Sequence, residues 1–184
     1  HDHFDIVFQN NQVMRLNDPR RFGAVLWAGQ DLDLHPLLAN LGPEPLEKTF
    51  HGHYLFSQLQ SRKAAIKTAI MDAHLVVGVG NIYSNEALFR SGIHPQYIAN
   101  QLSLAKCKKL VREIKATLND ALEAGGSSLR DFEAVNGNSG YFQQSYYVYG
   151  RTDQPCKRCK NLIKCIRLGQ RSTFFCKKCQ PYNK

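Results

Sequence analysis

Residues 149–179 read YGRTDQPCKRCKNLIKCIRLGQRSTFFCKKC and decide the fold of the carboxyl-terminal part of the chain. Two Cys-x-x-Cys pairs, separated by sixteen residues, supply four thiols, from Cys156, Cys159, Cys176 and Cys179. Each pair closes a tight turn, and the sulfur atoms of two such turns fit one tetrahedral zinc ion. Between the pairs, apolar residues alternate with Lys and Arg around Gly169, which predicts two short strands. We therefore expect a β-hairpin held by one structural Zn²⁺.

Paired cysteines have two other uses, a disulfide framework and a redox Cys-x-x-Cys site. A secreted disulfide framework requires a signal peptide, which the sequence does not display, and it leaves Cys107 and Cys165 without evident partners. Structural zinc is therefore favoured, and reduced cysteines indicate a cytoplasmic protein. Cys165 breaks the paired spacing, so we expect it to be a small buried apolar residue rather than a ligand.

Positive charge is concentrated in the same region. From Gly150 to Lys184 the sequence has ten Lys and Arg residues and one acidic residue, a net charge of +9 that equals the charge of the whole chain. The first 149 residues balance at fourteen basic and fourteen acidic residues. A merely solvated surface seldom has so unequal a balance, whereas a polyanion-binding surface does. Nucleic acid is the expected partner. No apolar run is long enough to span a membrane, so no membrane association is expected.

The amino-terminal residues have the pattern of strands. Residues 1–8 alternate, with Phe4, Ile6 and Phe8 on one face, residues 13–16 form a plausible hairpin partner, and residues 22–27 read as a further strand. The sequence begins without Met in the middle of this pattern, so we expect the amino-terminal part of a β-domain to be missing. We also expect the remaining strands to fold poorly alone, because their edges are unpaired.

The middle of the chain has a helical pattern. Residues 54–71 place apolar side chains near one stripe, with Arg62 and Lys67 available to solvent, and residues 104–124 keep a 3.6-residue period. Ser103 suits an N-cap of the second helix, and glycines at 125–126 suit its end. The His51-x-His53 pair is better read as a loop or helix cap than as a second metal site.

A glycine-bearing turn at 78–80 leads into another expected helix, whose start Asn81 could cap. Small residues there allow a phosphate to approach backbone N–H groups at the helix N-terminus. A plain helix-to-helix turn remains the alternative. The dinucleotide-binding fingerprint does not apply, because its third glycine is absent and no βαβ unit surrounds the turn.

Five motifs together resemble a known family over essentially the whole chain. They are DPRRFG at 18–23, LGPEPL at 41–46, VVGVGNIY at 76–83, GIHP at 92–95 and the four-cysteine finger. In this order they resemble bacterial formamidopyrimidine-DNA glycosylase, an α+β multidomain protein. The resemblance implies the following division: a remnant of the amino-terminal β-sandwich catalytic domain at 1–40, a linker at 41–47, a helix-two-turn-helix DNA-binding domain at 48–147 with a lesion-capping loop at about 127–147, and a zinc finger at 148–184.

The resemblance also implies roles for single residues. Arg20 corresponds to the arginine that contacts the cytosine opposite the lesion, and Phe22 to the wedge beside it, in keeping with the ability of such side chains to read base edges and to unstack bases. Asn81 and Arg171 correspond to residues that clamp phosphates around the flipped nucleotide. Arg171 is also the one catalytic candidate, as proton donor in δ-elimination. The other DNA-facing positions are His1, Arg62, Lys67 and Tyr149.

The family removes oxidised purines, chiefly 8-oxoguanine and formamidopyrimidines, from double-stranded DNA and then cuts the abasic strand. An amino-terminal proline attacks the sugar to form a Schiff base. Because the chain begins at His1 and lacks that Pro-Glu motif, we expect these residues to bind DNA without excising a base. The expected setting is a monomer in the bacterial cytoplasm. The alternatives are an endonuclease VIII-type glycosylase for oxidised pyrimidines, a non-catalytic zinc-ribbon nucleic-acid-binding module, and a zinc-stabilised protein–protein adaptor.

Overall fold

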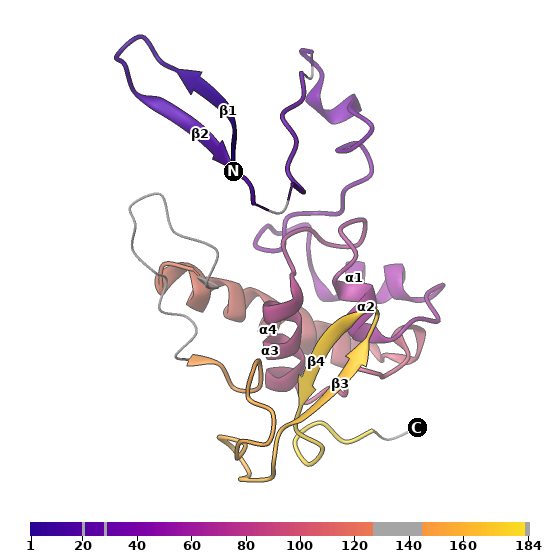
Figure 1. Ribbon diagram of the computed structural model, residues 1–184. Helices are drawn as coiled ribbons and strands as arrows, with labels where there is room; N and C mark the ends of the chain where they lie inside the picture. The colour runs from indigo at the N-terminus through magenta and orange to yellow at the C-terminus, as the bar shows by residue number, and fades with distance from the viewer. Residues whose placement is uncertain (20, 28, 127–144, 183–184) are drawn as a thin grey trace. The chain divides into compact units, whose positions relative to one another are not determined.

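The computed structural model describes residues 1–19, 21–27, 29–126 and 145–182. The chain forms two compact units, His1–Asn40 and Leu41–Lys184 (Figure 1). Mixed strands and helices make it an α+β protein, as expected from the sequence. In the described residues, no helix is both long and apolar enough to cross a membrane.

The first unit contains one antiparallel hairpin. Strand β1 (Asp2–Val7) pairs with β2 (Val13–Asn17), which confirms the expected hairpin. The further strand expected at 22–27 is not formed: among the described residues, the sheet of this unit consists of β1 and β2, and residues 22–27 do not pair with it. A short 3₁₀ helix, η1 (Leu32–Leu34), follows. None of the described side chains of this unit is buried, and Phe4 and Ile6 on one face of β1 are 43% and 38% exposed.

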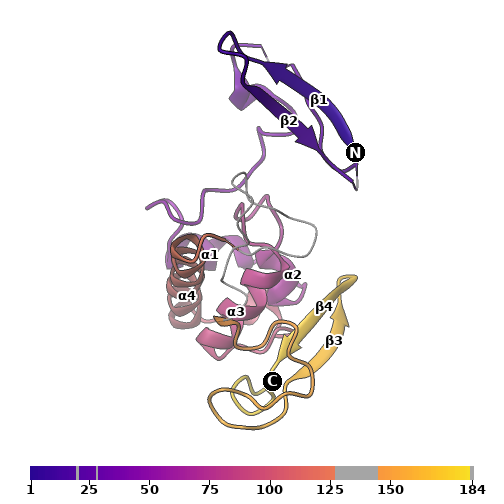
Figure 2. The ribbon, with the colours of Figure 1, turned by 60° about the vertical axis from the view of Figure 1, so that its left-hand side comes forward.

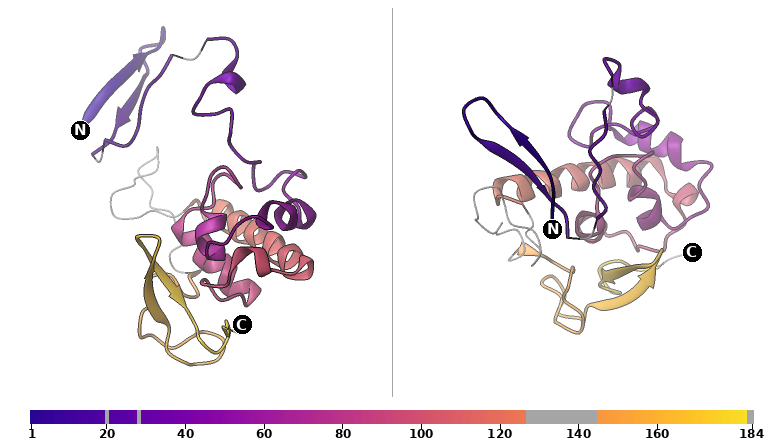
Figure 3. Two further views of the ribbon diagram at one scale, coloured as in Figure 1. Left: turned by 90° about the vertical axis from the view of Figure 1, so that its right-hand side faces the viewer. Right: turned by 45° about the horizontal axis from the view of Figure 1, so that its top comes forward.

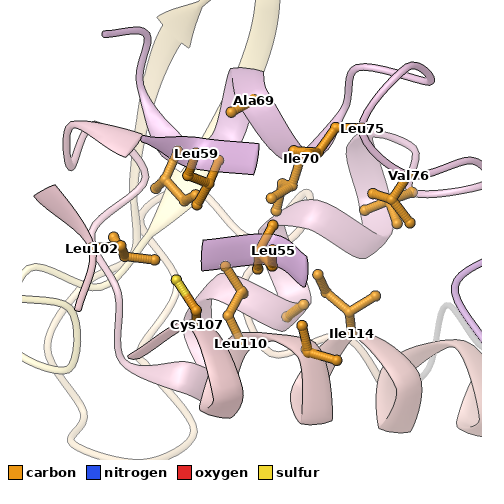
Figure 4. Packing of buried hydrophobic residues seen from close by; sticks show 14 of the residues in the cluster. Leu55, Leu59, Ala69, Ile70, Leu75, Val76, Leu102, Cys107, Leu110 and Ile114 are labelled. Atoms are coloured by element: carbon orange, nitrogen blue, oxygen red, sulfur yellow. The ribbon is translucent and has the colours of Figure 1, made fainter. Parts of the chain in front are cut away.

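The second unit has a helical core. Helices α1 (Gly52–Leu59), α2 (Ile66–Ile70), α3 (Asn81–Ser91) and α4 (Leu104–Glu123), with the 3₁₀ helix η2 (Ala99–Gln101), enclose one continuous apolar cluster. Figure 4 shows Leu55, Leu59 and Ile70 facing Leu110 and Ile114 of α4. The long salmon-coloured helix in Figure 3 is α4, whose apolar stripe faces this cluster.

The expectation of one helix over residues 54–71 is wrong, because the helical conformation is interrupted between α1 and α2. The intervening segment forms a bridge from Ala65 to Ile98, and the Ile66 amide donates to the Tyr97 carbonyl at 2.7 Å. Both halves still bury their apolar stripe, so the pattern does not reveal the break. The break turns Lys67 inward, to 1% exposure, so the expectation that this lysine is available to solvent is also wrong.

The expected ends of several helices are confirmed. His51 caps α1, because its Nδ1 accepts a hydrogen bond from the Tyr54 amide at 3.1 Å. The Ser103 hydroxyl accepts from the Lys106 amide at the start of α4, and Gly125, with φ of 72°, follows its end. Asn81, however, is the first residue of α3 and not its cap, which is Gly80.

The carboxyl-terminal hairpin is also confirmed. Strands β3 (Lys164–Leu168) and β4 (Arg171–Phe175) pair in antiparallel fashion through a turn at Gly169 and Gln170, both with positive φ. Figures 1 and 2 show β4 beside α3, with the turn directed toward α2. Cys165 is exposed, so the expectation of a buried apolar role is wrong: side chains on β3 alternate in exposure, and Cys165 falls on the outer face.

Candidate metal centre and nucleic-acid interface

The two Cys-x-x-Cys turns bring four sulfur atoms together. The Sγ atoms of Cys156, Cys159, Cys176 and Cys179 all lie within 4.8 Å of one another, with 3.9 Å between the first and last and 3.3 Å between the middle two. A tetrahedral zinc ion with Zn–S distances of about 2.3 Å needs sulfur atoms at roughly this separation. The four thiols therefore suit one structural Zn²⁺. Cys107 lies in the helical core, where burial raises the pKa of its thiol to about 11.

A buried glutamine supports the second turn of the finger. The Gln180 side chain accepts a hydrogen bond from the Cys176 amide at 3.1 Å and donates one to the Ile93 carbonyl at 2.8 Å. Gln180 is fully buried, so both groups depend on it for a partner in place of water. It joins the metal centre directly to the segment that follows α3.

The other end of the finger is joined to the start of α3 by a cluster of polar side chains. The Lys67 ammonium donates to Asn81 Oδ1 at 2.6 Å and lies 3.4 Å from the Ser172 carbonyl. Asn81 Nδ2 donates to that same carbonyl at 3.2 Å. Arg171, next to Ser172 at the start of β4, is exposed. Three residues predicted separately, Lys67, Asn81 and Arg171, are thus brought to one place.

The surroundings of Lys67 disfavour the protonated, charged form of its amine. Burial, the largest cause, and the nearby Arg171 guanidinium together lower the pKa of the Lys67 amine to about 8, against a smaller opposite effect of Cys165. With no carboxylate among its hydrogen-bond partners in the described residues, an anion beside it would stabilise the ammonium form. The cluster therefore combines two cations with amide groups at a helix N-terminus, which is the chemistry of a phosphate site.

Two buried polar residues of α3, neither of them predicted from the sequence, hold the finger in position. Asn85 Oδ1 accepts from the Phe174 amide of β4 at 2.7 Å. The Glu86 carboxylate accepts from three successive amides, of residues 147, 148 and 149, at 2.8, 2.9 and 2.9 Å. Both side chains are 1% exposed. Their one signal in the sequence is the apolar run at 87–89 that follows them directly. In the structure, nearly every side of this helix is buried.

The remaining predicted residues lie elsewhere or outside the described part. Tyr149 lies near the cluster, because its ring packs edge-on against Phe174 at 5.1 Å. Arg62, in the segment between α1 and α2, pairs with Asp72, which follows α2. His1 and Phe22 belong to the first unit, where Phe22 is 85% exposed. Arg20 and most of the expected lesion-capping loop, residues 127–144, lie outside the described residues.

Two families of known domains match the chain. Residues 41–133 match the formamidopyrimidine-DNA glycosylase H2TH domain, and residues 153–181 match a zinc finger found in FPG and IleRS. The formamidopyrimidine-DNA glycosylase of Methylobacillus flagellatus is 61% identical over 98% of this chain and 64% of its own length. That of Neisseria meningitidis is 54% identical over 98% of this chain and 66% of its own length. The chain thus spans about two thirds of these relatives.

Solved structures agree with the sequence matches. The crystal structure of MutM (Fpg) from Thermus thermophilus superposes with a TM-score of 0.88 at 35% identity, covering 98% of this chain and 68% of that one. The Lactococcus lactis Fpg in complex with DNA containing an abasic site gives a TM-score of 0.88 at 34% identity, covering 98% and 66%. Sequence, fold and metal centre agree: the chain belongs to the formamidopyrimidine-DNA glycosylase family.

Proposed function

We propose that this chain is the DNA-binding part of a base-excision repair glycosylase that removes oxidised purines from double-stranded DNA. The proposed whole protein excises 8-oxoguanine and formamidopyrimidines and then cleaves the abasic strand. It acts as a monomer in the bacterial cytoplasm, where its substrate lies. Support comes from solved relatives in complex with Fapy-dG, abasic-site and carbocyclic 8-oxo-G DNA.

The observation that carries the proposal is the hydrogen-bonded cluster of Lys67, Asn81 and the Ser172 carbonyl. It sets an exposed guanidinium, that of Arg171, next to the N-terminus of α3. We propose that Asn81 and Arg171 hold phosphates on either side of a flipped nucleotide and that Tyr149 lines the same surface. The buried Lys67 ammonium lies beneath that surface and acts on the phosphate through Asn81, to which it is hydrogen-bonded. Fixed donors of this kind are suited to a bent, extruded backbone.

The other proposed roles follow the family resemblance. Arg20 contacts the base opposite the lesion, Phe22 fills the gap in the stack, and His1 and Arg62 face DNA. Arg171 donates the proton in δ-elimination. The Schiff-base step is proposed for a protein that carries an amino-terminal Pro-Glu ahead of these residues. Borohydride trapping of such a protein on 8-oxoguanine duplex tests that step.

DNA binding by the 184-residue chain is tested with fluorescent duplexes. We expect tighter binding to a duplex with one abasic site than to an undamaged duplex of the same sequence. Asn81→Ala and Arg171→Ala should each weaken abasic-site binding by about tenfold or more, because each removes a hydrogen bond to a charged phosphate, worth roughly 1.5–3 kcal/mol. Lys106→Gln, on the exposed face of α4, is the control for loss of one charge.

The same assay separates the alternatives. A non-catalytic zinc-ribbon module would bind damaged and undamaged duplexes equally, and a protein–protein adaptor would bind neither with salt dependence. An endonuclease VIII-type protein would prefer oxidised pyrimidines. Between the two glycosylase branches, borohydride trapping decides: a protein that carries the amino-terminal Pro-Glu is trapped on matched duplexes with 8-oxoguanine or an oxidised pyrimidine.

A further inference from the structure

Three cations converge on one tyrosine ring at the far end of α3. The Arg90 guanidinium lies 5.5 Å from the centroid of the Tyr147 ring, the Arg158 guanidinium 5.5 Å and the Lys157 ammonium 5.7 Å. Arg158 also lies over Phe89, at 4.6 Å. Lys157 and Arg158 come from the first cysteine turn, and Arg90 from α3. We call Arg90, Tyr147, Lys157 and Arg158 the knuckle cluster.

The aromatic platform of the knuckle cluster is held rigidly. The Tyr147 amide donates to the Glu86 carboxylate at 2.8 Å, and the Tyr147 carbonyl accepts from Arg151 at 2.7 Å. Its ring stacks on the fully buried Phe89 at 5.3 Å between centroids. The hydrogen bonds fix the backbone of Tyr147, and moving the ring away from the cations would break its stacking on Phe89. Cation–π attraction offsets part of their mutual repulsion.

Among the described residues, the positive charge of this cluster is paired with a carboxylate only at Arg90. Arg90 pairs with Asp120 at 2.6 Å. Lys157 and Arg158 are exposed, and neither makes an ion pair with a carboxylate in the part of the chain that the structure describes. The Glu86 carboxylate, which is bonded to the platform, already accepts three backbone amides.

The zinc centre accounts for part of this charge. Four thiolates around one Zn²⁺ carry a net charge of −2, which nearby cations stabilise. The two cysteine turns, however, carry five exposed cations: Lys157, Arg158, Lys160, Lys177 and Lys178. The positive charge thus exceeds what the metal centre requires, and the excess faces solvent.

The knuckle cluster lies apart from the phosphate site at the start of α3. Asn81 opens this helix and Phe89 lies near its end, eight residues later. At 1.5 Å per residue the two places are about 12 Å apart along the helix axis. One phosphate cannot contact both, so any anion at the knuckle cluster is a different one.

We propose that the knuckle cluster is a second contact for the DNA backbone, binding a phosphate of the duplex outside the lesion. Lys157 and Arg158 supply the positive charge, and the rings of Tyr147 and Phe89 position these two side chains. The contact is independent of sequence, because it reaches phosphate and not base edges. It rests on the proposed function in that the phosphate belongs to the same duplex that Asn81 and Arg171 hold. As a consequence, the affinity for DNA should depend more strongly on salt concentration than the contacts of Asn81 and Arg171 alone would make it.

The test measures binding of the 184-residue zinc-loaded chain to undamaged and abasic-site duplexes over a range of salt concentration. For Lys157→Gln/Arg158→Gln, we expect the slope of log affinity against log salt to fall by about 0.9 for each phosphate that the variant no longer neutralises, on both duplexes. Lys157→Arg/Arg158→Lys keeps both charges and should retain the wild-type slope. Lys106→Gln/Arg112→Gln removes two exposed charges from α4, one of them 4.4 Å over the Tyr97 ring, and should also leave the slope unchanged.

Three outcomes would overturn the proposal. The slope of Lys157→Gln/Arg158→Gln could equal that of the wild type. The control pair on α4 could lower it equally, which would mean that only net charge matters. The glutamine variant could lose zinc, measured as metal per chain, which would assign the cations to the metal centre. If the wild type shows no preference for the abasic site while the slope still falls, the proposed function fails and the knuckle contact stands.

Discussion

At the scale of single residues, Lys67 carries a charge that its surroundings disfavour. Burial and the nearby Arg171 guanidinium lower its pKa from 10.5 to about 8, so the folded chain holds fewer protons than the unfolded chain between these values. The contribution of Lys67 to stability therefore rises with pH through this window. A bound phosphate favours the ammonium form and should raise the pKa again. DNA binding and proton binding are then coupled at this one side chain.

We predict that affinity for an abasic-site duplex falls as pH rises through about 8, because the free chain then loses the Lys67 proton that a bound phosphate would stabilise. Binding isotherms at constant ionic strength over a pH range that brackets this value measure the effect. Lys67→Gln has no charge to lose, so its weaker binding should be flat over the same range. An equally steep fall in Lys67→Gln would place the titrating group elsewhere.

Glu86 is a second residue of importance at this scale, because its carboxylate stabilises the segment 147–149. We predict that Glu86→Gln destabilises the second unit by about 2–4 kcal/mol, because an amide replaces a buried carboxylate that accepts three backbone N–H groups. Urea denaturation measures the loss. Asp120→Asn removes a half-exposed carboxylate that pairs with Arg90 and should cost no more than about 1 kcal/mol. Equal effects would contradict the special role of Glu86.

Residue-level prediction from the sequence succeeds where chemistry depends on spacing and fails where it depends on tertiary contacts. The four zinc ligands follow from their spacing, and His51 follows from helix-cap chemistry. The sequence predicts that Asn81 caps its own helix, but the Asn81 side chain bonds instead to Lys67 and to the finger. Nothing local to Asn81 indicates those partners, since the Ser172 carbonyl comes from 91 residues away.

At the scale of elements, the break between α1 and α2 shows what periodicity cannot reveal. Apolar residues of both helices reach the same cluster, so a continuous helix and two shorter helices have the same pattern. The break is set by the bridge from Ala65 to Ile98, a contact between segments distant in the sequence. The bounds of α4 agree with the sequence almost to the residue, because its cap, its period and its glycine end are all local.

The finger is the element that should depend most on its metal. Its own buried cluster is small, whereas the cluster of the helical core contains none of the four clustered thiols. We predict that chelation of zinc unfolds residues 148–182 and leaves the helices, because metal binding supplies about 10–16 kcal/mol in isolated finger peptides. Hydrogen exchange should show loss of protection in β3 and β4 with protection retained in α4.

Two cysteine variants provide the control for that prediction. Cys159→Ser removes a ligand and should lower zinc below one per chain, with the same loss of protection in β3 and β4. Cys165→Ser changes an exposed thiol on the outer face of the hairpin and should keep one zinc per chain. Zinc loss in Cys165→Ser would mean that the ligand set differs from the four clustered thiols.

At the scale of the whole molecule, the net charge and the buried apolar residues are distributed differently along the chain. The net positive charge lies after residue 149, whereas the buried hydrophobic residues among those described extend from Phe50 to Cys176. The first unit contributes no buried residue among those described. The order of five motifs indicates the family without any contact information. Whether the pattern at 22–27 forms a strand cannot be read from the sequence, because a strand needs a hydrogen-bonding neighbour.

Removal of residues 1–40 tests this division. We predict that residues 41–184 fold alone with a thermal midpoint within a few degrees of the whole chain, because every core cluster is built from residues after Asn40. Binding to undamaged duplex should change little, since the basic residues after 149 supply its electrostatic part. Preference for an abasic site should fall, because Arg20 and Phe22, the proposed contacts to the opposite base and the gap, are removed.

Phe22→Ala in the whole chain is the variant matched to this truncation. It should lower the preference for an abasic site without changing the slope of log affinity against log salt. Undiminished preference in residues 41–184 would assign lesion recognition to the cluster of Lys67, Asn81 and Arg171 alone.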